Sequence, residues 1–335
     1  MGLGKNFTAY GLQIGRVFAG PLSGIILALL LLCTLIGGVE AMLKPSPVFF
    51  HSTNLMNILL QTSINTIMAV GMTFVILTGG IDLSVGSLLA LCNVLLGTVM
   101  LAIGRGHGAG QLLSGVVVAL AAGLAVGLAN GAMTVRWRIP PFIVTLGMLG
   151  ICRGAALWVS HSQTQNLIGQ TLPAFSFIGN GSVAGVPVPA VLALLVVAIG
   201  HFLLKHTLFG RYVLAIGGNE EAARLSGVRV GVYKIIAYGL CGLLVGLAAL
   251  VQTSRLGSAN PTIAAGYELY AIAAVIIGGT SLMGGKGTIL GTLVGALIIG
   301  VLNNGLTLMN IADEIKQVII GSVIILAVMM DRKRI

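Results

Sequence analysis

The chain has 335 residues, of which 57% are hydrophobic and only 8% are charged. A soluble domain carries about 25% charged residues, so this composition cannot coat a soluble surface and excludes a soluble globular protein. The formal net charge of +10 does not indicate nucleic-acid binding, because the charged residues flank apolar runs instead of clustering with aromatic residues.

Long continuous apolar runs predict an all-α, polytopic bundle of membrane helices, whereas a membrane barrel would show alternating segments of about ten residues. Gly supplies 49 residues, which suits helices that pack closely in a membrane. The sixth and ninth runs are short, as is the turn 78–82, so either place could hide a broken or re-entrant helix. In chain order, we predict about ten spans, at residues 21–39, 55–77, 83–103, 112–135, 141–159, 189–204, 234–252, 267–282, 288–302 and 315–330.

The first apolar run, residues 20–39, follows Lys5 and Arg16. A cleaved signal peptide has an apolar core of only about 7–15 residues, whereas a spanning helix needs about 20. We therefore interpret this run as a retained first helix. The whole chain, residues 1–335, is expected to form a single transmembrane domain.

The distribution of Lys and Arg predicts the orientation, because cytoplasmic loops carry an excess of both. With ten spans, the two termini lie on the same side, and a cytoplasmic N-terminus leaves only Lys44, Arg105 and Arg255 clearly outside. We therefore expect both termini in the cytoplasm. The basic residues then placed inside are Lys5, Arg16, Arg136, Arg138, Lys205, Arg211, Arg224, Arg229, Lys234, Lys286, Arg332, Lys333 and Arg334.

Two loops and one internal echo complete the layout. The outer loop, residues 161–187, is polar and Gly-rich and lacks Asp, Glu, Lys and Arg, while the inner loop, residues 205–233, is strongly charged. Residues 76–87 resemble residues 277–288. Internal symmetry is common in transporters, although Gly-rich membrane turns can also look alike by chance.

The inner loop contains a segment that predicts one short helix with defined ends. Asn219 is a good N-cap, Glu220 and Glu221 occupy the first turn, and Gly227 supplies a left-handed residue at the end. The helix is too short and too polar to span a membrane. It suits docking to a soluble partner, and a surface helix capped only for stability remains the alternative.

The segment Glu221-Ala222-Ala223 followed by Gly227 looks like the coupling motif of ATP-binding-cassette importer permeases. From about residue 55 to residue 332, the chain resembles the permease subunits of bacterial ribose-type sugar importers. One departure is Tyr270, which stands where that family usually has Asp after a Glu-Leu pair, so the sugar specificity can differ from ribose. The resemblance rests on residues 68–73, 75–87, 214–227, 266–269, 278–282 and 284–287.

This resemblance implies a multi-pass protein of the bacterial inner membrane that pairs with a second permease copy, identical or not. It also implies a cytoplasmic ATPase that binds ATP and Mg, so this chain itself would hold no cofactor, and a periplasmic sugar-binding protein. In the family the short helix at about residues 219–227 fits a groove of the ATPase. The coupling residues implied here are Gly217, Gly218, Asn219, Glu220, Glu221, Ala222, Ala223, Arg224, Leu225 and Gly227.

A neutral sugar needs hydrogen-bonding side chains along its path, and each candidate also has a structural alternative. Gln61 and Asn65 are four residues apart on one helix face. The amides could equally join helices, Asp82 could cap the third span, and Glu268 and Arg153 could reach toward an interface. The candidate pathway residues are Gln61, Asn65, Asp82, Asn93, Glu268 and Asn303.

Other chemistries find less support in the sequence. A phosphate-binding loop would need Gly where Thr280 stands and Ser or Thr where Gly287 stands. Cys33, Cys92, Cys152 and Cys241 lie in apolar runs without metal-ligand spacing, and no catalytic grouping is visible, so we expect neither a metal site nor an enzyme. An ion-coupled secondary sugar transporter remains the alternative, but the acids cluster at turns and loops instead of mid-span.

Overall fold

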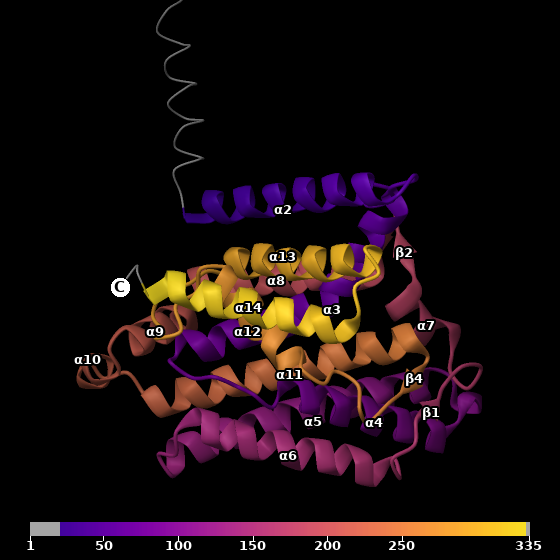
Figure 1. The fold of residues 1–335 in the computed structure, drawn as a ribbon. Coiled ribbons are helices and arrows are strands. Elements are labelled where there is room, and N and C mark those ends of the chain that lie inside the picture. Colours follow the sequence, from indigo (N-terminus) through magenta and orange to yellow (C-terminus); the bar gives the residue numbers. More distant parts are fainter. Residues whose placement is uncertain (1–20, 333–335) are drawn as a thin grey trace, which may run out of the picture.

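The computed structural model describes residues 21–332, which form an all-α bundle of roughly aligned helices (Figure 1). Two antiparallel pairs of two-residue strands, β1 with β4 and β2 with β3, lie in the loops. The elements are α2 (Pro21–Leu43), α3 (Ser52–Leu77), α4 (Val85–Ile103), the 3-10 turn η1 (Arg105–His107), α5 (Ala109–Arg136), α6 (Pro141–Val159), β1 (Gln165–Asn166), α7 (Pro173–Asn180), β2 (Ser182–Val183), β3 (Val186–Pro187), α8 (Val188–His206), α9 (Leu208–Gly218), α10 (Glu220–Leu225), α11 (Val230–Leu256), β4 (Ser258–Ala259), α12 (Tyr267–Ile277), α13 (Ile289–Leu308) and α14 (Asp313–Arg332).

Within residues 21–332, eight helices are long and apolar enough to cross a membrane: α2, α3, α4, α5, α6, α8, α11 and α13. They correspond to eight of the ten predicted spans and confirm the polytopic all-α class. The last predicted span is also helical, as the 20-residue α14, which carries charged residues in its first turn and at its end.

The predicted span at residues 267–282 is wrong at its C-terminal end. The helix α12 has 11 residues and stops at Ile277, and Gly279 then takes a left-handed conformation with φ of 84°. Eleven residues rise about 16 Å, roughly half of the hydrocarbon thickness of a bilayer. The chain therefore does contain a broken span, but at the eighth position and not at the places that looked short in the sequence.

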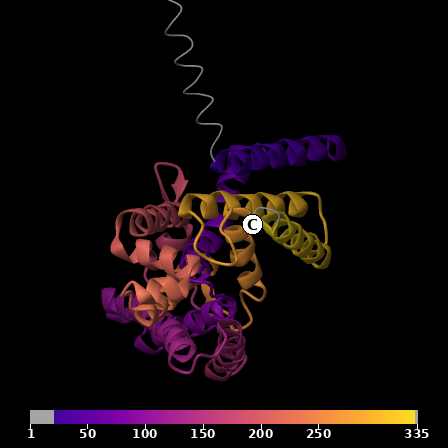
Figure 2. The same cartoon turned by 90° about the vertical axis from the view of Figure 1, so that its left-hand side faces the viewer.

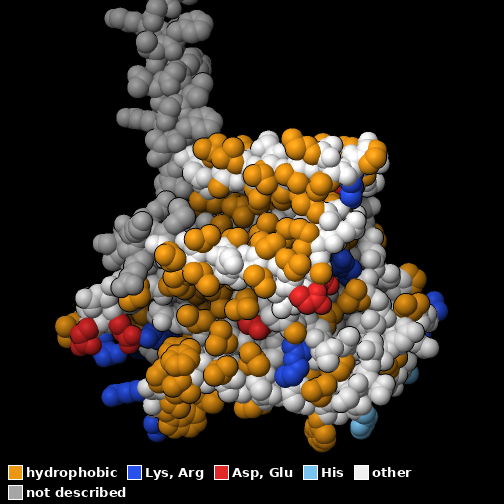
Figure 3. Space-filling view, viewed as in Figure 1, with side chains coloured by type: hydrophobic (Ala, Val, Ile, Leu, Met, Phe, Trp, Pro, Cys, Tyr) orange, Lys and Arg blue, Asp and Glu red, His pale blue; other side chains and the backbone are white. Residues whose placement is uncertain are grey.

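The helix α3 forms the centre of the bundle, because every residue from Thr66 to Leu77 is buried. Helix α2 lies along one side of the bundle and packs against α13 (Figures 1 and 2), while its side chains Leu27, Leu30 and Leu35 are exposed. Figure 3 shows the apolar side chains that cover the flanks of the molecule, as expected for a surface that faces lipid.

Helices α5 and α11 pack backbone against backbone through small residues. A Cβ atom added to Gly123 would lie 2.2 Å from the carbonyl oxygen of Gly242, and one added to Gly127 would lie 2.3 Å from that of Tyr238. No larger side chain fits at such distances. The high glycine content of the chain thus serves close helix contacts, which are a main source of association between helices in lipid.

The two Gly-rich segments that resemble one another in sequence also share a backbone conformation. Both α3 and α12 end in a left-handed glycine, Gly79 with φ of 79° and Gly279 with φ of 84°, in the hydrogen-bond pattern of a Schellman motif. This agreement favours internal symmetry over chance. In the structure Gly79 corresponds to Gly279, whereas the comparison of residues 76–87 with 277–288 pairs Gly79 with Thr280. The paired bonds are Gly79 N to Ile76 O and Gly279 N to Ile276 O, both 2.8 Å, and Gly80 N to Val75 O and Thr280 N to Val275 O, both 3.1 Å.

The two long loops lie at opposite ends of the bundle. Helices α9 and α10 of the inner loop occupy one end, which we call the α10 end, and α7 with the short strands occupies the other (Figure 1). Helix α2 begins and α14 finishes at the α10 end. The terminal cations Lys5, Arg16, Lys333 and Arg334 lie outside the described residues, so the cytoplasmic placement of both termini stays a prediction.

Candidate functional site

The short helix α10 has the ends that the sequence predicts. The Asn219 side chain accepts a hydrogen bond from the backbone N–H of Ala222 at 2.9 Å, which confirms Asn219 as the N-cap. The helix stops at Leu225, and Gly227 follows with φ of 85°. The chain therefore leaves the helix sharply and returns toward the bundle in α11.

Acidic and basic side chains pair on the surface of α10. Arg224 contacts Glu220 at 2.9 Å and Glu221 at 3.1 Å, and the Lys234 ammonium contacts Glu220 at 2.6 Å. The two pairs of Arg224 are exposed, and exposed pairs contribute about 0–1 kcal/mol each. Glu221 is 67% exposed and Leu225 is 82% exposed, so α10 offers both a charge and an apolar side chain to a partner.

A small apolar cluster holds α10 against the rest of the protein. Ile216 of α9, Ala223 of α10 and Val230 of α11 are buried together, with Val228 and Tyr233 packed against them. Three consecutive helices are thus joined through one core. A force on α10 therefore reaches α9 and α11 directly.

Gly217 joins this segment to the centre of the bundle. The Gly285 N–H donates to the carbonyl oxygen of Leu77 at 3.0 Å, and a Cβ atom on Gly217 would lie 1.8 Å from that oxygen and 2.3 Å from the Gly285 nitrogen. Only glycine fits there, whereas Gly218 faces open space. Helix α9 therefore rests on the end of α3 and on the loop after α12 at the same time.

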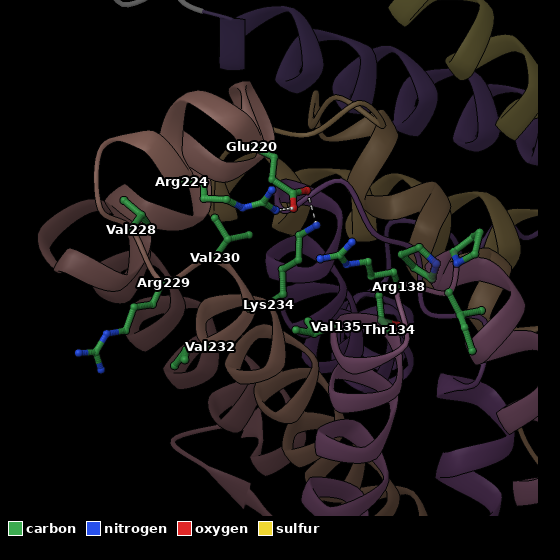
Figure 4. A pocket seen from close by; sticks show the side chains of 14 residues that line it. Thr134, Val135, Arg138, Glu220, Arg224, Val228, Arg229, Val230, Val232 and Lys234 are labelled. Carbon is green, nitrogen blue, oxygen red and sulfur yellow. Dashed lines mark hydrogen bonds and ion pairs between the residues drawn. The ribbon is translucent and has the colours of Figure 1, made fainter.

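A cavity of about 780 Å³ lies beside α10, between α11 and the connection from α5 to α6 (Figure 4). In this view Glu220, Arg224 and Lys234 lie close together, and Arg138 approaches them from the opposite wall. The lining residues are Thr134, Val135, Arg138, Ile139, Pro140, Pro141, Glu220, Arg224, Val228, Arg229, Val230, Gly231, Val232 and Lys234.

A second cavity, of about 210 Å³, lies nearer the α7 end, and we call it the amide pocket. It brings together three of the predicted pathway residues, Gln61 and Asn65 from α3 and Asn303 from α13. The amide nitrogen of Asn65 points to the Tyr270 carbonyl oxygen at 3.5 Å, and its side-chain oxygen is buried without a partner among the described residues. The remaining lining residues are Thr62, Ile64, Arg255, Tyr267, Tyr270, Ala296, Ile299 and Gly300.

Sequence reasoning missed Arg255 and Tyr267 as members of this pocket. Arg255 lies in the last turn of α11 and Tyr267 in the first turn of α12, so only the fold brings them beside α3. Tyr270 stood out in the sequence as a departure from the family pattern, and it lines the same pocket. The departure at Tyr270 was the one signal in the sequence for the part of the amide pocket that α12 lines.

The other three pathway candidates do not line the amide pocket. Asn93 is buried, donates to the Thr253 hydroxyl at 2.7 Å and accepts from the Asn260 N–H at 2.7 Å. It therefore joins α4 to α11 and to the loop before α12, which is the structural alternative for such an amide.

Asp82 anchors a turn and does not cap the helix that follows. Helix α4 begins at Val85 after Ser84, and one Asp82 carboxylate oxygen accepts from both the N–H of Ser84 at 2.9 Å and its hydroxyl at 2.6 Å. The Asn130 amide donates to the same hydroxyl at 3.0 Å. The prediction of Asp82 as the N-cap is therefore wrong, because the N-cap position belongs to Ser84, two residues later.

Glu268 and Arg153 contact protein backbone near the start of α12. Arg153 donates to the carbonyl oxygens of Pro261 at 2.6 Å and Ile263 at 3.0 Å, so it holds the loop before α12. Glu268 is half-buried in the first turn of α12 and lies against Gly86, where a Cβ atom would be 2.3 Å from its carboxylate.

Metal-ligating side chains are scattered. Over residues 21–332, no group of three or more His, Cys, Asp or Glu side chains lies together. Cys92, Cys152 and Cys241 are buried free thiols, and Cys33 is a half-buried one.

Comparison with known proteins identifies the family. A family described as "Branched-chain amino acid transport system / permease component" matches residues 54–328. The ribose import permease protein of Escherichia coli (strain K12) is 47% identical over 290 residues, which cover 86% of this chain and 88% of that protein. The ribose import permease protein of Bacillus subtilis (strain 168) is 44% identical over 302 residues, covering 88% and 89%.

A D-allose transport system permease protein of Escherichia coli (strain K12) is 39% identical over 289 residues, covering 86% of each chain. No solved structure matches. The chain therefore belongs to this family of transport-system permease components, as a multi-pass protein of the bacterial inner membrane and not as an enzyme.

Proposed function

We propose that the chain is the membrane-spanning permease of an ATP-driven importer for a neutral monosaccharide, either ribose or a related sugar. The observation that carries this proposal is the similarity, over 86% of the chain, to a ribose import permease at 47% identity. Relatives named for D-allose, L-arabinose and fructose are less similar, at 39% and 37% identity. All of these names describe sugar permeases, and the L-arabinose relative is named as part of an ABC transporter, which favours an ATP-driven sugar importer over an ion-coupled transporter.

The amide pocket supports a sugar over an amino acid. Its polar lining consists of amides, the tyrosines 267 and 270, Thr62 and one cation, Arg255, and no carboxylate from residues 21–332 lines it. A free amino acid presents an ammonium group that a carboxylate usually binds. A sugar presents uncharged hydroxyl groups and a ring oxygen, and these match amides and hydroxyls that donate and accept hydrogen bonds. The pocket therefore suits a neutral polyol.

Membership of this family implies an ATPase subunit and a substrate-binding protein. We assign docking of the ATPase to α10 and its flanks, Gly217 to Gly227, where exposed Glu221 and Leu225 face outward over a packed base. In this account ATP and Mg are bound by the ATPase, and this chain holds no cofactor. A second permease copy, identical or not, completes the pathway.

The contacts suggest how docking reaches the sugar. A push on α10 reaches Gly217 through the shared apolar cluster, and Gly217 touches both Leu77 and the loop after α12. Leu77 ends the same helix that carries Asn65, 12 residues or about 18 Å away. The loop after α12 leads back to Tyr270 on the facing wall of the amide pocket. Both walls of the pocket can thus move when α10 moves.

Charge reversal at Glu221 tests the docking surface. Because its ion pair with Arg224 is exposed, Glu221→Lys should cost less than about 1 kcal/mol of stability. We expect normal membrane insertion, loss of transport and weaker capture of the ATPase by the tagged permease, measured by mass spectrometry of the purified complex. Glu314→Lys, an exposed acid in the first turn of α14, is the matched control and should retain the ATPase. Normal uptake by Glu221→Lys would refute the assignment.

A further inference from the structure

The cavity beside α10 is formed by three separate segments of the chain. The connection from α5 to α6 contributes Arg138, Ile139 and two prolines, α10 contributes Glu220 and Arg224, and the start of α11 contributes Val230 to Lys234. Its volume of about 780 Å³ is more than three times that of the amide pocket, at about 210 Å³. It is therefore large enough for a substantial ligand group.

The lining of this cavity is strongly positive. Arg138, Arg224, Arg229 and Lys234 face a single acid, Glu220, so the lining carries a net formal charge of three positive units. Glu220 is already paired with both Arg224 and Lys234. The Arg138 and Arg229 side chains form no ion pair or hydrogen bond with any residue from 21 to 332. The positive charge of the lining therefore exceeds the negative charge that the described residues offer it.

The two cations without a partner among the described residues, Arg138 and Arg229, point in different directions. In Figure 4 Arg138 points toward Lys234 and the Glu220 carboxylate, whereas Arg229 lies on the opposite rim and extends away. Arg138 has a positive φ of 54°, a conformation that few non-glycine residues adopt. The polypeptide thus accepts a strained backbone at the residue whose free guanidinium faces the cavity.

Exposed apolar side chains lie next in sequence to residues that line the cavity. Trp137, immediately before Arg138, is 63% exposed, and Phe142 and Ile143 at the start of α6 are also exposed. Val232 both lines the cavity and is exposed. Exposed aromatic and apolar residues next to cations at the ends of spans are typical of the boundary between membrane and water. Figure 3 shows Lys and Arg side chains beside apolar ones at this end of the molecule.

We propose that this cavity binds the phosphate group of an anionic phospholipid from the leaflet at the α10 end, which the Lys and Arg distribution makes the cytoplasmic one. Basic pockets between helices at that leaflet bind lipid head groups. Arg138 holds the phosphate, since a guanidinium group can bind phosphate with two parallel hydrogen bonds. Arg224 and Lys234, which stay paired with Glu220, add positive charge beside it. The acyl chains lie on the exposed surface of Trp137, Phe142 and Val232. The bound head group bridges α10 to the connection between α5 and α6.

Lipid retention by the purified full-length protein tests this site. Phosphatidylglycerol or phosphatidylcholine is added to the detergent-solubilised protein, and bound lipid is counted by native mass spectrometry. We expect adducts with phosphatidylglycerol and few with phosphatidylcholine. Arg138→Gln should weaken phosphatidylglycerol binding about fivefold, the effect expected for one cation near an anionic surface. Arg211→Gln, which removes an exposed cation of α9 that does not line the cavity, should bind like the unchanged protein.

Two further arms separate the lipid from other anions. Inorganic phosphate at millimolar concentration should not displace phosphatidylglycerol, because it gains nothing from the apolar rim. Complete displacement would identify the ligand as a free phosphate and overturn the proposal. Equal phosphatidylglycerol binding by Arg138→Gln and the unchanged protein would also overturn it. So would loss of ATPase capture by Arg138→Gln with lipid binding intact, because the cavity would then be a protein interface.

Discussion

Replacing Gly217 by Ala places one methyl group between α9 and the centre of the bundle. The new Cβ atom would lie 1.8 Å from the Leu77 carbonyl oxygen and 2.3 Å from the Gly285 nitrogen. Both neighbours are backbone atoms, and they are joined by a hydrogen bond of 3.0 Å. Neither can turn away as a side chain could. Helix α9 must shift, or the bond between Gly285 and Leu77 must break.

The expected change in the free energy of unfolding combines two destabilising contributions and one stabilising contribution. Overpacking a tight site costs about 1–3 kcal/mol, and loss of the hydrogen bond costs about 0.5–1.5 kcal/mol. Ala is favoured over Gly inside a helix by about 1 kcal/mol. The net destabilisation expected for Gly217→Ala is therefore about 1–3 kcal/mol. At Gly218 an added Cβ meets nothing within 4 Å, so Gly218→Ala should be neutral or stabilise by up to about 1 kcal/mol.

Thermal unfolding of the two variants in the same detergent measures this difference. Gly217→Ala should melt several degrees below the unchanged protein, and Gly218→Ala at or above it. Sugar uptake by Gly217→Ala should fall while ATPase capture persists, because α10 keeps its exposed face and only the contact of α9 with α3 is disturbed. Equal melting temperatures for the two variants would refute the close approach at Gly217. Normal uptake by Gly217→Ala would refute its part in transmitting the movement.

Three further substitutions test the interior. Asn303→Leu should lower sugar uptake without weakening ATPase capture, as measured in parallel on one preparation, because Asn303 lines only the amide pocket. Tyr270→Phe should alter the preference among monosaccharides in competition uptake assays while the melting temperature stays the same, because it removes one hydroxyl from that pocket. Asn93→Leu should lower the melting temperature, since it removes the bonds to Thr253 and Asn260, each interhelical bond contributing about 0.6 kcal/mol.

Structural features that depend only on residues close together in the chain could be predicted from the sequence. The ends of α10 follow from side chain and backbone preferences within a few residues, so Asn219 and Gly227 could be assigned before the fold was known. The shared lining of Gln61 and Asn65 follows from helical periodicity, because residues four apart lie on one face. Asn303 joined them only as a polar residue in an apolar run, and the fold was needed to bring it opposite α3.

The sequence prediction placed the end of this span too late. Residues 278–282 carry no charge and were included in the predicted span, but the left-handed Gly279 ends α12 at Ile277. Hydropathy reports how a segment partitions between water and lipid and not where its backbone turns. The role of Asp82 was likewise decided by a neighbour, because Ser84 takes the capping position and the Asp82 carboxylate binds its N–H and hydroxyl.

Contacts between segments far apart in the chain could not be predicted from one sequence. Nothing near Gly217 indicates that it touches Leu77 and Gly285, which are 140 and 68 positions away. Arg153 likewise binds the carbonyl oxygens before α12 across more than 100 residues. Such contacts depend on how the helices pack, and packing is set by the whole chain.

Sugar uptake by a reconstituted system tests the central claim most directly. The permease is placed in lipid vesicles with its ATPase inside and its sugar-binding protein outside, and entry of labelled ribose is measured. The account predicts uptake that requires ATP and Mg inside and both partner proteins, and that persists when an uncoupler abolishes ion gradients. Uptake by the permease alone, without ATP and sensitive to an uncoupler, would contradict the account and identify an ion-coupled transporter.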